Sequence, residues 1–225
     1  MEHTSWSDDD GGRAFLRALP VLAGEAPEFD IDQAPSDPAT LFAQWLRQAV
    51  AAEVPEPHAM TLSTIDALGF PRARVLIVKS VDADGWHFAA VSASQKGADL
   101  SANPVAALTF HWPAVVRQVR VVGDIVDDGP AAAAADFRAR PLESRAQALT
   151  LRQSTPMADP GEMDTEIDKA RRKLADDPDL TPVEWLSYCV RPAEVEFWQG
   201  YPDRRHLRLS YRRADDGWDR IRLWP

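Results

Sequence analysis

The sequence predicts an α+β protein that is mainly β, in which antiparallel strands form a split-barrel-like sheet. Three observations predict this class. Five runs with strand-like alternation follow one another between residues 59 and 126, joined by short turns. A helical block follows at 129–177, and strand-like runs close the chain at 184–225. Because the helices stand between strands, we expect one domain rather than two.

The segment before the first strand contains one clear helix. Residues 1–12 are predicted to be disordered, and residues 1–30 to form a partly disordered lead-in to a domain spanning 31–225. Asp37 suits the N-cap of a helix and Pro38 suits its first turn, while "VPEP" ends it. The predicted apolar face of this helix comprises Leu41, Phe42, Trp45, Leu46, Ala49 and Val50.

The strands are predicted from alternation bounded by turn residues. "AMTLSTI" and "RARVLIVKSV" flank the turn "DALGF" and predict a hairpin. "WHFAAVS", a short helix "QKGADLSANP", "VAALTFH" and "VVRQVRVVGDIV" follow. Three helical segments, "GPAAAAADFRARP", "LESRAQALTLRQS" and "GEMDTEIDKARRKLADD", precede the closing strands "EWLSYCV", "AEVEFWQG", "RHLRLSYRR" and "WDRIRLW".

Composition narrows the range of functions. The net charge of −10 and the pI near 4.9 argue against a nucleic-acid surface. Cys189 is the single cysteine, which excludes disulfides within the chain and CxxC metal sites. No apolar run approaches the ~20 residues of a membrane helix, and the start lacks a signal-peptide pattern, so we expect a cytoplasmic protein that binds no membrane.

Three clusters of positive charge are candidates for anion binding. Strand alternation places Arg74 and Lys79 on opposite faces of "RARVLIVK", which is either a buried strand with a charge near each end or part of an anion site. The turn "SASQKG" offers hydroxyls, Lys96 and a helix N-terminus. Near the C-terminus, Arg204, His206 and Arg208 share one face of a predicted strand.

Other site chemistries find no support in the sequence. The five histidines are scattered without a ligand-type partner at i+2 or i+4, so no metal site is predicted. No Gly-x-Ser-x-Gly elbow, P-loop or Gly-x-Gly-x-x-Gly motif occurs.

Taken together, these segments resemble the pyridoxine/pyridoxamine 5′-phosphate oxidase family of flavoproteins, from about Phe42 to Pro225. The likeness depends on "RARVLIVK", "SASQKG", "NPVAALTFHW", "VRQVRVVG", "RARPLES", "RQS", "VEFWQG", "RRHLR" and "WDRIRLWP", in this order and at family-like spacing. The resemblance implies a split β-barrel homodimer with FMN at each subunit interface. It also implies an oxidase that produces an aldehyde and hydrogen peroxide, with O2 as the electron acceptor.

The resemblance further implies a set of site residues, several of them contributed by the partner subunit. Those implied to bind FMN are Arg74, Val75, Leu76, Ile77, Lys79, Ala89, Ala90, Ser94, Gln95, Lys96, Gln118, Gln153, Ser154, Trp198 and Arg208. Those implied to bind the substrate are Lys79, Asp136, Arg140, Ser144, Arg204 and His206, the last two as catalytic residues.

Several positions depart from the family pattern. Ala89-Ala90 replaces a Tyr-Thr pair, Gln95 replaces an arginine as in the phenazine-biosynthesis branch, and Asp136 replaces a phosphate-binding tyrosine. We expect Asp136 either to face a substrate phosphate or, as we favour, to pair with Arg138 or Arg140. Two alternatives to a pyridoxamine 5′-phosphate oxidase therefore stay open: an FMN oxidase of a phenazine-like precursor, and a flavin- or haem-binding protein without turnover.

Overall fold

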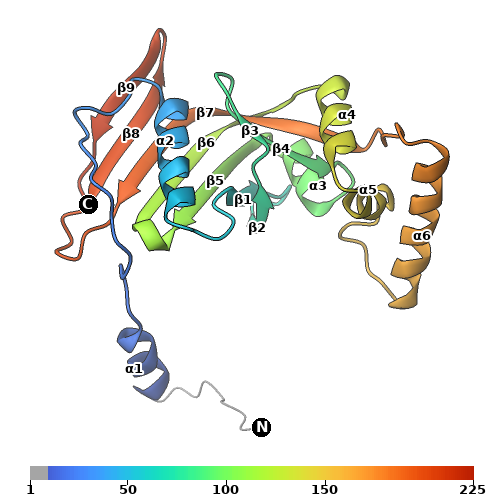
Figure 1. Cartoon of the computed structure of the whole chain (residues 1–225), viewed down its shortest axis with the longest axis horizontal. Coiled ribbons are helices and arrows are strands. Elements are labelled where there is room, and N and C mark those ends of the chain that lie inside the picture. The colour runs from blue at the N-terminus through green and yellow to red at the C-terminus, as the bar shows by residue number, and fades with distance from the viewer. Residues whose placement is uncertain (1–9) are drawn as a thin grey trace.

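The computed structural model describes residues 10–225, so the predicted disorder of residues 1–9 lies outside the described residues. Residues 10–12, also predicted to be disordered, instead begin helix α1 (Asp10–Ala18). The helix formers after the two glycines, "RAFLRA", favour this conformation. Figure 1 shows α1 at a distance from the rest of the molecule, joined to it by an extended segment.

Within the described residues the sheet has nine strands, and every pair of neighbours is antiparallel. The strands are β1 (Ala59–Ile65), β2 (Pro71–Ile77), β3 (Ser80–Val81), β4 (Trp86–Val91), β5 (Val105–Trp112), β6 (Arg117–Asp127), β7 (Trp185–Gln199), β8 (Leu207–Ala214) and β9 (Gly217–Arg222). Their order is β2-β1-β5-β6-β7-β4-β3, with β8 on β7 and β9 on β8. The predicted α+β class and the hairpin of β1 and β2 are confirmed.

The long strand β7 replaces two strands that the sequence predicted separately. Its first half pairs with β4 and its second half with β8, while β6 runs along both. Pro192, which cannot donate a hydrogen bond, lies where the register shifts beside Gly123. A Cβ on Gly123 would lie 1.9 Å from the Arg191 carbonyl oxygen, so only glycine permits this close approach.

The other helices are α2 (Pro38–Ala51), α3 (Gln95–Ala102), α4 (Pro130–Ala139), α5 (Leu142–Leu149) and α6 (Gly161–Asp176), with a 3₁₀ turn at Pro113–Val115. The Asp37 carboxylate accepts from the Thr40 amide and caps α2 as predicted. Four predicted face residues of α2 are buried, but Val50 is 59% exposed because it lies one position beyond the buried stripe.

Two hydrophobic cores hold these elements together. The larger core packs α2 against the sheet through rings such as Phe42, Trp45 and Phe110. The smaller core joins α4, α5 and α6 to β4 and β7 through Phe137, Trp185 and small residues. As a result the helical block stands at one end of the sheet, with α2, β8 and β9 towards the other (Figure 1). No helix between residues 10 and 225 has the length and apolar character needed to cross a membrane.

Candidate functional site

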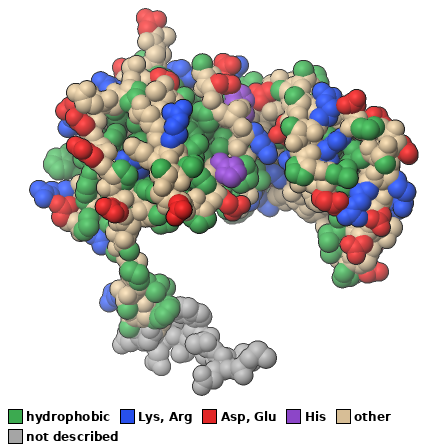
Figure 2. Space-filling view, in the orientation of Figure 1, with side chains coloured by type: hydrophobic (Ala, Val, Ile, Leu, Met, Phe, Trp, Pro, Cys, Tyr) green, Lys and Arg blue, Asp and Glu red, His purple; other side chains and the backbone are tan. Residues whose placement is uncertain are grey.

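A cavity of about 650 Å³ lies between the strands β2 and β4 and the helices α3, α4 and α5. Figure 2 shows Lys and Arg side chains where the sheet meets the helical block. The predicted residues that line the cavity are Val75, Leu76, Ile77, Lys79, Ala89, Ala90, Lys96, Asp136, Arg140, Ser144 and Gln153. Lining residues that the sequence analysis did not single out are Val91, Ala139, Pro141, Gln147, Ala148 and Trp185.

Strand β2 forms one wall of this cavity, and it is more exposed than a buried strand would be. The interpretation of "RARVLIVK" as a buried strand is wrong for this chain, because Val75 is 67% exposed. The physical reason is that β2 is an edge strand with β1 as its one neighbour in the sheet. An apolar edge beside cationic groups can contact a flat, partly apolar ligand that also carries an anion.

Lys96 supplies a buried positive charge on α3. The residue is 7% exposed, and its Nζ donates to Gln153 Oε1 at 2.7 Å. Burial, and next the positive charge of Arg74, lower the pKa of Lys96. Arg74 itself donates to Thr64 Oγ1 at 2.7 Å and lies 3.4 Å from Asp99 Oδ2. Asp99 thus orients Arg74, while Lys96 has a neutral amide as its hydrogen-bond partner.

The residues around the start of α3 are arranged by local hydrogen bonds. The Ser94 hydroxyl donates to the Val91 carbonyl at 2.6 Å and accepts from the Gly97 amide, so it acts as the N-cap of α3. The Gln95 amide donates to Ser154 Oγ at 3.3 Å. These contacts bring "SASQKG" and "RQS" together, while FMN binding by these residues, Ser94 included, stays a prediction.

The opposite wall, formed by α4 and α5, places Asp136 differently from our expectation. Asp136 Oδ2 accepts from Trp185 Nε1 at 3.0 Å, and no ion pair between Asp136 and an arginine occurs within residues 10–225. Our expectation that Asp136 pairs with Arg138 or Arg140 is therefore wrong. The carboxylate instead accepts its hydrogen bond from the indole N–H of Trp185 on β7. Arg140 instead stacks on the Trp185 ring, with its guanidinium carbon 4.5 Å from the ring centroid.

One hydrogen-bond donor of Arg140 is left unsatisfied in this wall. Its Nε is buried and has no hydrogen-bond partner among the described residues. Burial lowers the pKa of Arg140, and the charge of Asp136 opposes that effect. A buried N–H donor without an acceptor is costly, so this wall favours a ligand that brings an acceptor or an anion.

A second group of predicted residues lies apart from the cavity and the start of α3, and it comprises Gln118, Trp198, Arg204, His206 and Arg208. Strand register places Gln118 opposite Trp198, and Trp198 opposite Arg208, in one row across β6, β7 and β8. Arg208 donates to Glu196 Oε1 at 2.9 Å and Oε2 at 3.1 Å, and to the Trp224 carbonyl at 2.8 Å. Burial acts to raise the pKa of Glu196, but hydrogen bonds from Arg208 and Arg120 lower it overall.

Arg204 and His206 lie in the turn before β8, not on a strand. The prediction that they share a strand face with Arg208 is wrong, since Arg204 adopts the left-handed conformation (φ 66°) and its amide donates to the Tyr201 carbonyl at 3.0 Å. His206 Nδ1 accepts from the Tyr201 amide at 3.0 Å, so a neutral ring carries its proton on Nε2. The His206 ring centroid lies 5.0 Å from that of Trp198.

Fold and site together define an antiparallel split-barrel protein of the α+β class, with a cavity suited to an anionic small molecule. Residues 46–173 match the family model described as pyridoxamine 5′-phosphate oxidase. Residues 185–225 match the model of the pyridoxine 5′-phosphate oxidase C-terminal dimerisation region. The chain belongs to the pyridoxamine 5′-phosphate oxidase family and is an oxidase, as the resemblance implied.

Similar proteins agree with this membership. The chain is 45% identical over 194 residues to a pyridoxine/pyridoxamine 5′-phosphate oxidase of Pseudomonas paraeruginosa, covering 85% of this chain and 90% of that protein. It is 42% identical to one of Thermosynechococcus vestitus, with coverage of 85% and 90%. The structure of PhzG from Burkholderia lata, in complex with tetrahydrophenazine-1-carboxylic acid, aligns with a TM-score of 0.83 and 28% identity over 90% of this chain and 100% of that one.

Sequence reasoning missed the residues that orient the cationic groups. Glu196, which is 4% exposed, holds Arg208, and Asp99, which is 2% exposed, holds Arg74. Trp185 holds both Asp136 and Arg140. Glu196 carries one usable signal, since it is an acidic residue within the otherwise apolar run "VEFW". Neither Asp99 nor Trp185 differs from its sequence neighbours in a way that would identify it.

Proposed function

We propose that this chain is an FMN-dependent oxidase that converts pyridoxamine or pyridoxine 5′-phosphate to pyridoxal 5′-phosphate, reduces O2 to H2O2, and works as a homodimer. The observation that carries the proposal is that one cavity presents cationic side chains on two walls. Lys96 stands on α3, whereas Arg140 stands between α4 and α5. Two cationic walls suit two phosphate groups, one on a cofactor and one on a substrate.

The residues present fit FMN. Lys96, Arg74 and the start of α3 would hold its phosphate. Within residues 10–225, the buried Lys96 cation has a neutral amide as its hydrogen-bond partner. The exposed edge of β2 at Val75 and the small residues Ala89 and Ala90 would lie along an isoalloxazine ring. When bound, FMN supplies the hydride-accepting centre and the reaction with O2.

The proposed homodimer explains why the site residues form two groups. Strand pairing places Val75, Arg120 and Glu196 in one row across the sheet, on the face opposite the larger core. Val105 and Val122 lie on this same face and are 39% and 48% exposed. This face combines exposed valines with Gln118, Trp198 and the Arg120–Glu196 ion pair. Such a mixed surface supports pairing with a second copy, so that each cavity would receive the second group from its partner.

Arg204 and His206 would act on the substrate. The exposed Arg204 guanidinium offers a planar fork for a ring substituent or phosphate. His206 presents Nε2 as a donor, because its Nδ1 is occupied by the Tyr201 amide. In this arrangement His206 would hold a proton near the substrate. The ring of Trp198 would help to position the imidazole of His206.

Aerobic turnover tests the proposal directly. Purified protein loaded with FMN should consume O2 and release H2O2 in equal amounts with pyridoxal 5′-phosphate when given pyridoxamine 5′-phosphate. Unphosphorylated pyridoxamine should react poorly. Protein that binds no FMN, or that binds it without oxidising either phosphorylated substrate, would contradict the proposal.

One observation favours a second candidate function, the oxidation of a phenazine-like precursor. Asp136 places a carboxylate on the wall where a phosphate dianion would bind, and Trp185 holds it there. Repulsion between like charges disfavours a dianion more than a monoanion such as a carboxylate. Turnover of tetrahydrophenazine-1-carboxylic acid in preference to pyridoxamine 5′-phosphate would establish this alternative.

A further inference from the structure

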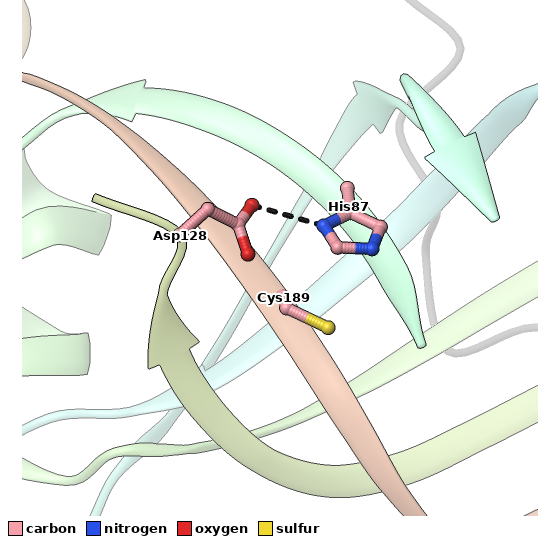
Figure 3. Close-up of side chains that lie close together, drawn as sticks. All are labelled: His87, Asp128 and Cys189. Atoms are coloured by element: carbon pink, nitrogen blue, oxygen red, sulfur yellow. Dashed lines mark hydrogen bonds and ion pairs between the residues drawn. The ribbon is translucent and has the colours of Figure 1, made fainter. Parts of the chain in front are cut away.

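His87, Asp128 and Cys189 converge on one point outside the cavity, at the junction of β4, the end of β6 and β7. Figure 3 shows their side chains facing a common space, with the His87–Asp128 contact marked. The potential ligand atoms of the three residues lie within 4.8 Å of one another. The proposed oxidase chemistry uses none of them.

Strand pairing and a backbone hydrogen bond position the three residues of this cluster. His87 and Cys189 are direct partners across the β4–β7 ladder, so their side chains emerge on the same face. Asp128 follows β6, and its amide donates to the Ser187 carbonyl at 2.9 Å. Cys189 is 2% exposed, and the side chains of His87 and Asp128 are 13% and 16% exposed. The cluster is thus sheltered yet reachable from one side.

Supporting contacts orient the candidate ligands. His87 Nδ1 lies 2.9 Å from Asp128 Oδ2, and Asp82 Oδ1 lies 3.0 Å from the other ring nitrogen, Nε2. Asp128 Oδ2 also accepts from the Ser187 hydroxyl at 2.8 Å. A carboxylate on the far nitrogen of a histidine is the usual orienting partner of a metal-binding imidazole.

We propose that His87 Nδ1, Asp128 and Cys189 form a binding site for Zn²⁺, with solvent as the fourth ligand. Zinc takes nitrogen, sulfur and oxygen ligands at about 2.0–2.3 Å, which sets ligand atoms about 3.3–3.6 Å apart in tetrahedral geometry. The His87–Asp128 separation has to widen by about half an ångström, within the reach of side-chain rotation. The ion displaces the thiol proton and the proton between Nδ1 and Oδ2, both of which leave to solvent.

The alternative role of Cys189 as a reactive nucleophile is disfavoured. Burial, followed by the charges of Asp128 and Asp82, raises the pKa of its thiol to about 12, so the free thiolate is scarce at neutral pH. A metal ion overcomes this cost by binding the thiolate directly. A bound ion would connect the segment just before α4 to β4 and β7, and α4 carries one wall of the cavity.

These three residues carry no spacing motif along the chain, so the sequence predicts no metal site. His87 and Asp128 are 41 positions apart, and Cys189 lies on a third segment. Spacing along the chain identifies ligands only where one helix or turn carries them. Here strand pairing brings the three residues together.

Cobalt titration of the untagged, chelator-treated, FMN-loaded chain tests the site. Because Cys189 is the single cysteine, a near-ultraviolet thiolate-to-cobalt charge-transfer band reports on this residue alone. We expect one Co²⁺ per chain with this band, displacement by Zn²⁺, and a rise of about 5–10 °C in thermal midpoint at a hundredfold excess of Zn²⁺ over its Kd. Wild-type protein that shows no such band would overturn the proposal without reference to any variant.

Variants assign the ligands. Cys189→Ser should lose the band, and Asp82→Asn, which changes an exposed orienting residue, should weaken Zn²⁺ affinity about 10- to 100-fold. His111→Gln removes an exposed histidine elsewhere and should change neither property. Equal Zn²⁺ affinity in wild type and His87→Gln would reject the ligand set, whether or not Cys189→Ser folds.

Discussion

Replacing Lys96 with methionine separates cofactor binding from stability. Lys96 is 7% exposed, and its Nζ donates to Gln153 Oε1 at 2.7 Å. Methionine matches the length of the lysine stem but lacks the ammonium group. A hydrogen bond to a charged group contributes about 1.5–3 kcal/mol, so the Kd for FMN should rise roughly 10- to 150-fold. The apoprotein should stay within about 1 kcal/mol of wild type, since relief from burial and from Arg74 offsets the lost bond.

The lowered pKa of Lys96 fixes the direction in which the free energy of unfolding changes with pH. The pKa of Lys96 in the folded apoprotein lies below its ordinary value, so between the two values the unfolded chain binds more protons. The free energy of unfolding therefore rises with pH in that window, and Lys96→Met should lack this rise. In FMN-loaded protein the anion would favour the charged lysine and reduce the rise.

The assays are FMN titration of apoprotein by flavin fluorescence, and thermal unfolding of apo and loaded protein across alkaline pH. Lys169→Met is the matched control, because Lys169 is an exposed lysine on α6 paired with Glu166. An unchanged Kd in Lys96→Met would refute the role of Lys96 at the phosphate. A loss of several kcal/mol in the apoprotein would show that Lys96 is structural instead.

Three further outcomes follow from the same geometry. Glu196→Gln should lower the free energy of unfolding by about 2 kcal/mol at neutral pH, because Arg208 loses its carboxylate partner. The pKa of Glu196 is lowered, so this difference in denaturant unfolding should shrink as pH falls through the folded pKa and vanish in strong acid; a gap that persists there would contradict it. Asp136→Asn keeps an acceptor for the indole but removes the charge, so KM for pyridoxamine 5′-phosphate should fall severalfold, and a raised KM would count against repulsion. Arg204→Ala should leave the Kd for FMN unchanged and lower kcat/KM about tenfold or more, whereas Arg205→Ala should change neither; equal loss of FMN binding in both would reject this division.

The sequence by itself determined the local elements and the family. Alternation in "AMTLSTI" and "RARVLIVK" defined the first hairpin, and Asp37 with the apolar stripe from Leu41 defined α2. These features depend on residues within one or two turns of one another, so periodicity and capping are sufficient to predict them. The order of the family motifs likewise needs no contacts.

Only the tertiary structure decided which residues from distant segments contact one another. Two strands that the sequence predicts separately form the single strand β7. Gly123 on β6 allows the backbone of β7 to approach closely at Pro192, where the β6–β7 register shifts. The tertiary structure gave Asp136 an indole partner from β7 in place of an arginine on its own segment. Each outcome depends on a contact between segments that are distant in the chain, and such a contact leaves no periodic pattern in the sequence.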